Sequence, residues 1–208
     1  MFQTDPYGQM PEAKKENALQ AWYTKFASQP HQPFFANGLI FLALFILVIF
    51  LSYSQVVDLA VSLTIFHAYA LVFVVFAQFF LGFLFVVFPR FLMQAEVTKE
   101  IYMNQFKIYF VGTLLFFISI FVSHYLAIVS GVILLVAQIF SFKILYAIHT
   151  NSLMKEKYDT RWVLISFLTG IISHAFFIIS MFDFSFNSVI QIASLNAGFY
   201  LFLFTLIF

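Results

Sequence analysis

The stretch FHAYALVFVVFAQFFLGFLFVVFPRF, residues 66–91, decides the fold class of this chain. Before its final arginine, the only residues with polar groups are His67, Tyr69 and Gln78. The hydrocarbon core of a membrane is about 30 Å thick, and a helix of about 20 apolar residues crosses it. Among all 208 residues, 63% are hydrophobic and only 9% are charged, which excludes an ordinary soluble domain. The sequence therefore predicts an integral membrane protein.

Six segments of the sequence are long and apolar enough to cross a membrane as helices. They are residues 37–53, 60–88, 106–123, 125–148, 161–181 and 188–208. Their uninterrupted apolar runs lack the alternation that the strands of a membrane barrel show. We therefore expect an all-α, polytopic bundle of about six transmembrane helices. Residues 37–208 would form this one domain, after an N-terminal segment at residues 1–36.

The ten positively charged residues predict the orientation of the bundle, since short loops rich in Lys and Arg stay in the cytoplasm. They fall before the first span, around the second loop and around the fourth loop: Lys14, Lys15, Lys25, Arg90, Lys99, Lys107, Lys143, Lys155, Lys157 and Arg161. The first, third and fifth loops contain none. We therefore expect a cytoplasmic N-terminal segment and, in a bacterium, a multi-pass protein of the inner membrane.

The N-terminal segment contains one short amphipathic pattern. Leu19, Trp22, Tyr23 and Phe26 recur at helical spacing and form one apolar stripe, and Pro11 is a candidate helix start. Trp and Tyr favour the headgroup level of a membrane, as do nearby lysines on an anionic inner leaflet. This pattern predicts a helix that lies flat on the inner leaflet, with a flexible tail as the alternative.

The other end of the sequence, NAGFYLFLFTLIF at residues 196–208, is apolar to its last residue. Membrane exits are commonly marked by polar or basic flanks, and none follows here. We therefore expect the natural protein to continue beyond Phe208.

Composition excludes several kinds of chemistry. The chain has no Cys, which excludes disulfides, thiolate ligands and covalently attached c-type haem. No Asp or Glu lies inside a predicted span, so paired carboxylates are not expected there. A net charge of +1 gives no basic patch for nucleic acid. No Gly-rich phosphate loop or H-E-x-x-H pair occurs.

Two histidines, His67 and His174, lie inside the predicted spans, where polar groups are costly and face the bundle interior. Gln78 follows His67 by eleven residues, which returns it to within about 20° of the same helix face. Counted back from Met181, His174 lies roughly 10 Å below the outer surface, the side from which His67 enters. Two histidines at similar depth would coordinate a b-type haem, or share a copper ion with a third ligand. The alternative is that each only hydrogen-bonds a neighbouring helix.

Other polar residues have simpler interpretations. The last span has a polar and small stripe on one side: Asn187, Gln191, Ser194, Gly198 and Thr205. Helix packing explains such a stripe more readily than ligand binding does, and the stripe is expected to face inward. His124 and His149 lie near helix ends and are expected to be surface residues.

Three motifs follow one another in the first half of the chain: SQPHQPFFANG at residues 28–38, FHAYALVF at 66–73 and GFLFVVFPRF at 82–91. This ordered series resembles the first half of NnrS family proteins, and SHAFF at 173–177 is similar to a later segment of that family. The residues that match are His31, Pro33, Phe34, Phe35, His67, Gly82, Phe83, Leu84 and Pro89. Tyr69 and Ala70 replace the second His and the Glu of the family's HAHE motif. A copper site that used those two positions would lack both ligands here.

The resemblance implies a haem- and copper-containing membrane protein of about twelve helices, linked to the bacterial response to nitric oxide. The six helices expected here would then be half of a larger bundle. Together with the spacing of the spans, it favours haem b as the cofactor at His67 and His174, with Gln78 on the same expected face as His67, and it adds His31 to His67 and His174 as a metal ligand. Its partners would be membrane lipid, nitric oxide and a redox partner. Nothing in the sequence predicts an oligomeric state or a catalytic activity.

Three hypotheses follow. The first is a haem-binding protein of the NnrS type that handles nitric oxide or protects against it. Such a protein would also bind copper if a third ligand were present. The second is a transporter or channel in which the stripe around Gln191 lines a path. The third is a structural or assembly subunit whose polar residues only bind helices together. A haem absorption spectrum separates the first from the other two.

Overall fold

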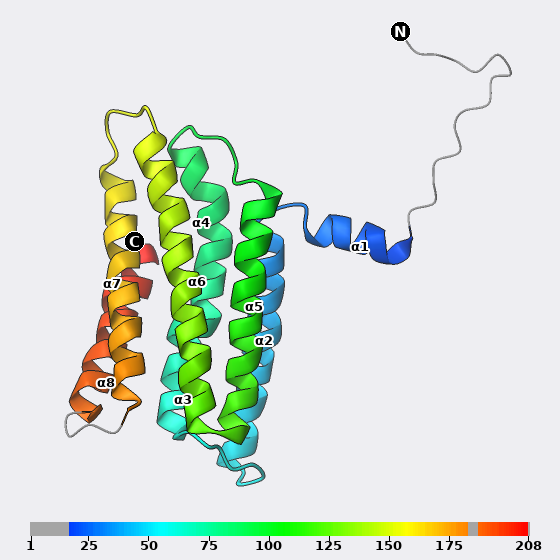
Figure 1. Cartoon of the computed structure of the whole chain (residues 1–208), viewed down its shortest axis with the longest axis vertical. Coiled ribbons are helices and arrows are strands. Elements are labelled where there is room, and N and C mark those ends of the chain that lie inside the picture. Colours follow the sequence, from blue (N-terminus) through cyan, green and yellow to red (C-terminus); the bar gives the residue numbers. More distant parts are fainter. Residues whose placement is uncertain (1–16, 183–186, 208) are drawn as a thin grey trace, which may run out of the picture.

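The structure is a computed structural model in which residues 17–182 and 187–207 are described. The described residues form helices and connecting loops, with no strand among them. Figure 1 shows an upright bundle with one short helix projecting from its side. The elements in order are α1 (Ala18–Phe26), α2 (His31–Tyr53), α3 (Leu63–Tyr69), η1 (Ala70–Phe76), α4 (Ala77–Phe91), α5 (Lys99–Val122), α6 (His124–Asn151), α7 (Tyr158–Ser180), α8 (Asn187–Asn196), η2 (Ala197–Phe204) and α9 (Thr205–Ile207).

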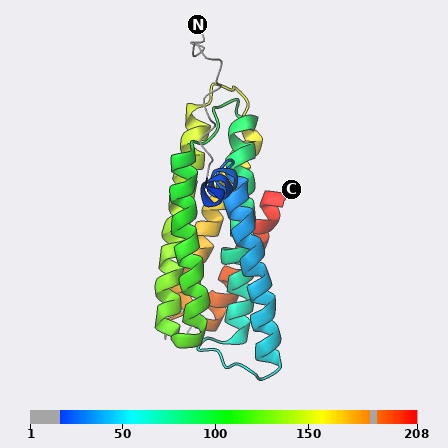
Figure 2. The same cartoon turned by 90° about the vertical axis from the view of Figure 1, so that its right-hand side faces the viewer.

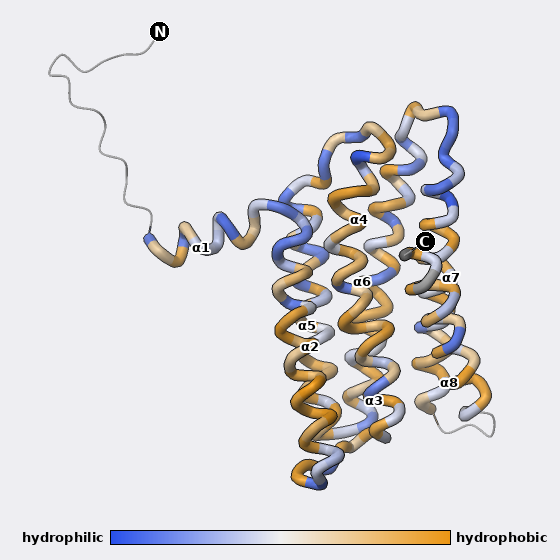
Figure 3. Tube along the Cα trace, turned by 180° about the vertical axis from the view of Figure 1, so that it is seen from behind, coloured by the Kyte–Doolittle hydropathy of each residue, from blue (hydrophilic) through white to orange (hydrophobic). Residues whose placement is uncertain are grey.

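The bundle has the dimensions that its apolar sequence predicts. Five described helices are long and apolar enough to cross a membrane: α2, the continuous run from α3 to α4, α5, α6 and α7. The predicted sixth span, residues 188–208, coincides with α8, η2 and α9, but its apolar helix Ser188–Leu203 is shorter than the five candidates, so a sixth span stays a prediction. Figure 3 shows apolar residues along the middle of the bundle and polar residues concentrated near its ends. The predicted all-α membrane bundle is confirmed.

The second span is interrupted by a π-helical segment. Ser62 begins α3 by accepting a hydrogen bond from the Ile65 N–H through its hydroxyl, and the helix runs on through η1 into α4. A π-helical turn contains about one residue more than an α-helical turn, so it rotates the residues beyond it by about 100°. The faces of α3 and α4 therefore cannot be aligned by counting at the α-helical period.

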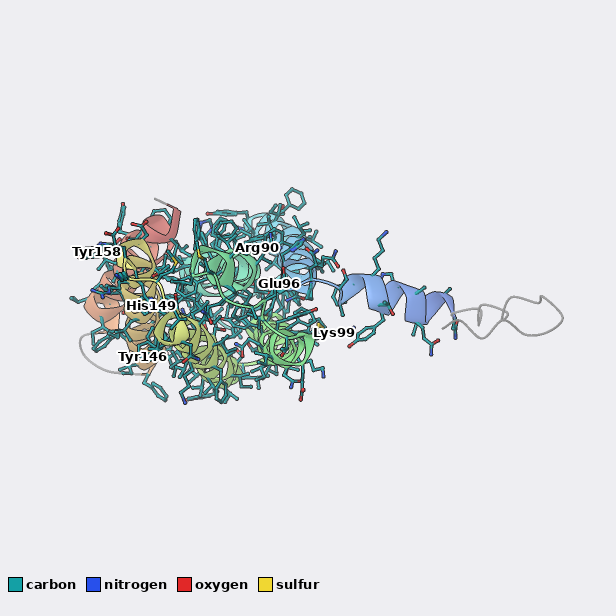
Figure 4. All side chains as sticks on the ribbon, turned by 90° about the horizontal axis from the view of Figure 1, so that it is seen from above. Arg90, Glu96, Lys99, Tyr146, His149 and Tyr158 are labelled. Atoms are coloured by element: carbon teal, nitrogen blue, oxygen red, sulfur yellow. The ribbon has the colours of Figure 1, made fainter. Side chains whose placement is uncertain are left out.

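The two ends of the bundle differ in charge. The loops at residues 92–98 and 152–157 lie at one end, and the loops at 54–62 and around Ser123 lie at the other. Figure 4 looks onto the first of these ends, where Arg90 and Lys99 lie and Arg90 forms an ion pair with Glu96 at 3.1 Å. Lys155 and Lys157 lie in the loop 152–157 at this same end, while the loop 54–62 at the other end contains no Lys or Arg.

The short helix α1 projects sideways from the bundle, and Figure 2 shows it almost end-on. Trp22 and Tyr23 are exposed, while Phe26 packs edge-on against the Phe106 ring at 5.8 Å. The connection to the bundle is fixed because the Tyr102 hydroxyl donates a hydrogen bond of 2.8 Å to the Ala27 carbonyl. The helix therefore exists as predicted; Pro11, the candidate start, lies outside the described residues, and contact with a lipid surface stays a prediction.

Phenylalanine fills the core between α2, α4 and α5. Phe34 is fully buried and meets the rings of Phe85 and Phe106 edge-on at 5.7 and 5.6 Å. A methyl group at Gly82 would lie only 2.9 Å from the Phe35 ring, so the glycine permits this approach. The first and third sequence motifs therefore pack directly against each other.

Candidate functional site

One buried group of polar side chains joins α3, α6 and α7. The Tyr69 hydroxyl lies 2.7 Å from His174 Nε2, and His174 Nδ1 lies 2.8 Å from Gln138 Oε1. All three side chains are buried, each with no more than 1% of its surface exposed. We call this group the histidine cluster. Tyr69 is six residues from the start of α3 and His174 is six residues from the end of α7, so the cluster lies toward the end that bears few charges.

The hydrogen bonds determine which His174 nitrogen carries the proton. Gln138 Oε1 can only accept, so Nδ1 carries the hydrogen and donates it. Nε2 of the neutral ring is then the acceptor, and the Tyr69 hydroxyl donates to it. This is the tautomer in which both contacts are hydrogen bonds, and it aims the phenolic proton directly at a basic nitrogen.

Aromatic rings enclose the pair. The Phe73 ring stacks on His174 with centroids 4.6 Å apart and an interplanar angle of 15°. Phe177 stacks on Tyr69 at 5.0 Å, and Phe116 lies against the same tyrosine at 4.9 Å. Each of these three phenylalanines is almost completely buried. The cluster is therefore held rigidly in an apolar surrounding.

Two glycines make room for this arrangement. A methyl group at Gly131 of α6 would lie 3.1 Å from the Tyr69 hydroxyl, and one at Gly198 of η2 would lie 2.7 Å from the tip of Phe73. The sixth helical segment thus packs against the ring that covers His174. One donor remains unused, because Gln138 Nε2 is buried and has no hydrogen-bond partner among the described residues.

A second buried network joins α2, α4 and α5. Gln78 Nε2 donates to the Val74 carbonyl at 3.0 Å and to the Thr113 hydroxyl at 3.2 Å, and Asn37 Nδ2 donates to Gln78 Oε1. Asn37, Gln78 and Thr113 are buried. We call these three residues the amide cluster. Both hydrogens of the Gln78 amide and its oxygen are used, so Gln78 has no free donor for a cofactor.

His67 lies apart from both networks. Its side chain is exposed, meets the Phe45 ring at 5.5 Å, and makes no hydrogen bond with any described residue. The prediction that His67 and Gln78 share one face is wrong, since one is exposed and the other buried. The π-helical segment between them rotates Gln78 away from the position that α-helical counting gives.

Comparison with known proteins adds the family. Residues 25–208, nearly the whole chain, match the profile of a family described as "NnrS protein". The chain belongs to the NnrS family. No curated protein and no solved structure matches it. The resemblance carried by three short motifs is thereby confirmed, and it extends through α7 and the sixth helical segment.

Within this NnrS family chain, the remaining candidate histidines are dispersed. His31 begins α2 near the charged end of the bundle and contacts Phe35, so the structure does not bring it to His174. His124 and His149, expected at the surface, are half-buried. His124 Nε2 donates to the Met181 carbonyl at 2.7 Å, and His149 Nδ1 is hydrogen-bonded to Thr160 at 3.0 Å. Among the described residues, no three His, Asp or Glu side chains are grouped as metal ligands.

The stripe of the last span divides into two parts. Ser194 and Gly198 are buried as predicted, and the Ser194 hydroxyl donates to the Ile190 carbonyl at 2.6 Å. Thr205 is exposed, so the prediction that the whole stripe faces inward is wrong; η2 is π-helical and rotates the residues beyond it. Gln191 is half-buried, and the Asn187 side chain lies outside the described residues. This face packs against neighbouring helices.

A haem between His67 and His174 does not fit these residues. Both ring nitrogens of His174 are hydrogen-bonded, and Phe73 covers its face. The exposed side chain of His67 instead leaves an imidazole accessible at the surface of the bundle. The two histidines therefore have different capacities: His67 has a free ring that is able to coordinate iron, and His174 does not.

Sequence reasoning missed two members of the histidine cluster. Tyr69 was considered only as a departure from a family motif, and Gln138 was given no role. A signal for Gln138 was available, because an amide in the middle of an apolar span is costly and faces a partner. The position of Tyr69 opposite His174 had no such signal, since lateral neighbours of helices cannot be read from spacing along one helix.

Proposed function

We propose that this chain acts in the bacterial inner membrane as a haem-binding protein of the NnrS family in the response to nitric oxide. The family match over residues 25–208 is the observation that carries the proposal. The proposed partners are membrane lipid, nitric oxide and a redox partner. The positive charge around one end of the bundle supports a cytoplasmic location for that end.

His67 is the residue that would hold the haem. Its ring is exposed and makes no hydrogen bond with a described residue, so coordination would cost no existing hydrogen bond. A haem held by His67 alone would supply iron that is able to bind a diatomic ligand. Haem is favoured over copper here, because a protein copper site needs several ligands and the described residues contain no such group.

The histidine cluster supports a structural part of the same proposal. Tyr69 follows His67 by two residues and is fixed by its hydrogen bond to His174. This bond holds α3 against α7 and so determines where the His67 side chain emerges. The last-span residues Ser194 and Gly198 are used in packing, so they give no support to a transport path.

An absorption spectrum of the purified protein, expressed with added haem precursor, tests the proposal. We expect a Soret band that His67→Leu removes or shifts. Because His67 is exposed, the same substitution should change the free energy of unfolding by less than about 0.5 kcal/mol. Loss of the band would then report lost ligation rather than lost folding.

His149→Ala is the matched control, because His149 is a half-buried histidine at the opposite end of the bundle. It should leave the spectrum unchanged. Absence of a Soret band from the unmodified protein would contradict haem binding. An unaltered spectrum in His67→Leu would contradict ligation by that residue.

A further inference from the structure

We infer that Tyr69 and His174 form a buried redox pair, in which one-electron oxidation of Tyr69 is accompanied by transfer of its phenolic proton to His174 Nε2. The pair consists only of side chains of this chain, so the inference does not depend on haem. The observation that carries it is the 2.7 Å contact between the Tyr69 hydroxyl and His174 Nε2, deep between α3 and α7.

Oxidation of a phenol in an apolar interior requires a place for its proton. A charged phenol radical without a partner would be costly to bury. In Tyr69 the O–H already points at the accepting nitrogen of a neutral imidazole, so the proton needs to move only along an existing hydrogen bond. Tyr109 provides the contrast, because it is buried to the same 1% exposure and makes no hydrogen bond with a described residue.

The step balances as follows. The Tyr69 O–H bond breaks, an N–H bond forms at His174 Nε2, and one electron leaves the ring. A neutral tyrosyl radical and an imidazolium remain. The electron goes to a small uncharged one-electron oxidant that dissolves in the membrane, such as nitrogen dioxide, which becomes nitrite. A one-electron reductant reverses the step, and the proton returns from Nε2 to the phenolic oxygen.

Two contacts of His174 would partly offset the cost of burying the charged ring that this step creates. Its Nδ1–H already donates to Gln138 Oε1, and this hydrogen bond strengthens when the donor is charged. The face of Phe73 lies 4.6 Å from the imidazole, which gives a cation the stacking partner that an aromatic ring provides. Both contacts are present before the proton arrives, so little rearrangement is needed.

The same enclosure would protect the radical. Phe177 and Phe116 cover the Tyr69 ring, which is only 1% exposed. This cover separates a radical there from the exposed tyrosines and from molecules outside the bundle. Radicals on exposed tyrosines such as Tyr125 and Tyr158 lack this cover and should decay first.

Nitrogen dioxide generated by pulse radiolysis of nitrite provides the test, with the purified protein frozen at increasing times for electron paramagnetic resonance. We expect the unmodified protein to retain a long-lived tyrosyl radical after the signals of exposed tyrosines have decayed. Tyr69→Phe should abolish this long-lived fraction. Tyr109→Phe, which removes the hydroxyl of another tyrosine with 1% exposure, should retain it.

A second measurement uses the unmodified protein and does not depend on how the variants fold. With ¹⁵N-labelled histidine, the long-lived radical should show a changed nitrogen coupling, and its formation should be slower in D₂O. Absence of a long-lived radical, its survival in Tyr69→Phe, or a spectrum insensitive to histidine labelling would overturn the inference. Tyr69→Phe should also keep the Soret band, so failure of haem binding and failure of the redox pair are distinguishable.

Discussion

The amide cluster and the histidine cluster are both buried between three helices, yet they differ in the chemistry of their members. Asn37, Gln78 and Thr113 are neutral groups that do not ionise near neutral pH, and the Gln78 amide is fully hydrogen-bonded. The histidine cluster contains an imidazole and a phenol, and it leaves Gln138 Nε2 without a partner. Burial alone therefore does not distinguish structural polar groups from reactive ones.

The difference extends to the backbone around each cluster. Tyr69 immediately precedes the π-helical segment η1, and Phe73 lies inside it. Gly198, which contacts Phe73, lies in the second π-helical segment, η2. Such segments are frequent at functional sites. The amide cluster also has one contact to η1, through the Val74 carbonyl, but its side chains come from regular α-helices.

The largest effect on stability is expected from Gly198→Leu, which would displace Phe73, the ring that stacks on His174. A single added carbon would already lie 2.7 Å from Phe73, and Phe73 cannot move without leaving His174. We expect the free energy of unfolding to fall by about 3 kcal/mol, the upper part of the range for overpacking. Unfolding by heat or denaturant in detergent measures this loss.

Ala193→Leu is the control for added bulk, because Ala193 is exposed in α8 of the same helical segment. It should leave the unfolding midpoint nearly unchanged. Equal midpoints for the two variants would show that η2 does not pack tightly on Phe73.

An intermediate effect is expected from Gln78→Leu in the amide cluster. The substitution leaves Asn37 Nδ2 without its acceptor and Thr113 without its donor. Buried groups that lose a partner typically cost about 1–3 kcal/mol, and hydrogen bonds between membrane helices lie at the lower end, so we expect a loss of about 2 kcal/mol. Haem absorption should not change, because Gln78 does not adjoin the exposed His67. A lost Soret band with an unchanged unfolding midpoint would show instead that Gln78 belongs to the cofactor site.

Much of the fold could be predicted from the sequence, because helix length and apolarity are properties of single segments. The predicted span 125–148 corresponds to α6 at His124–Asn151, and 161–181 corresponds to α7 at Tyr158–Ser180. The structure extends the helices into polar residues at their ends, as in α5, which begins at Lys99 rather than at residue 106. Counting apolar residues identifies the part of a helix that lies in the membrane core, but it misses the polar turns at the helix ends.

The site was less predictable because it depends on rotation and on lateral neighbours. His174 was correctly expected to be buried, but its partner proved to be Tyr69 instead of His67. The expected alignment of His67 with Gln78 assumed an α-helical period through residues that are π-helical. No pattern in the sequence marks η1, which reads as an ordinary apolar run.

The smallest effect is expected from Gln138→Leu, which makes the comparison between the two clusters quantitative. Removing Gln138 deprives His174 Nδ1–H of its acceptor, but it also removes the buried Nε2 group that has no partner among the described residues. These two contributions have opposite signs, so we expect a net loss below about 1 kcal/mol, against about 2 kcal/mol for the same substitution at Gln78. Unfolding of both variants in the same detergent gives the difference directly. If Gln138→Leu is as destabilising as Gln78→Leu, Nε2 must have a partner such as a buried water molecule, which usually makes about three hydrogen bonds to otherwise unsatisfied groups. In that case both clusters are saturated, and their difference lies only in the imidazole and phenol of the histidine cluster.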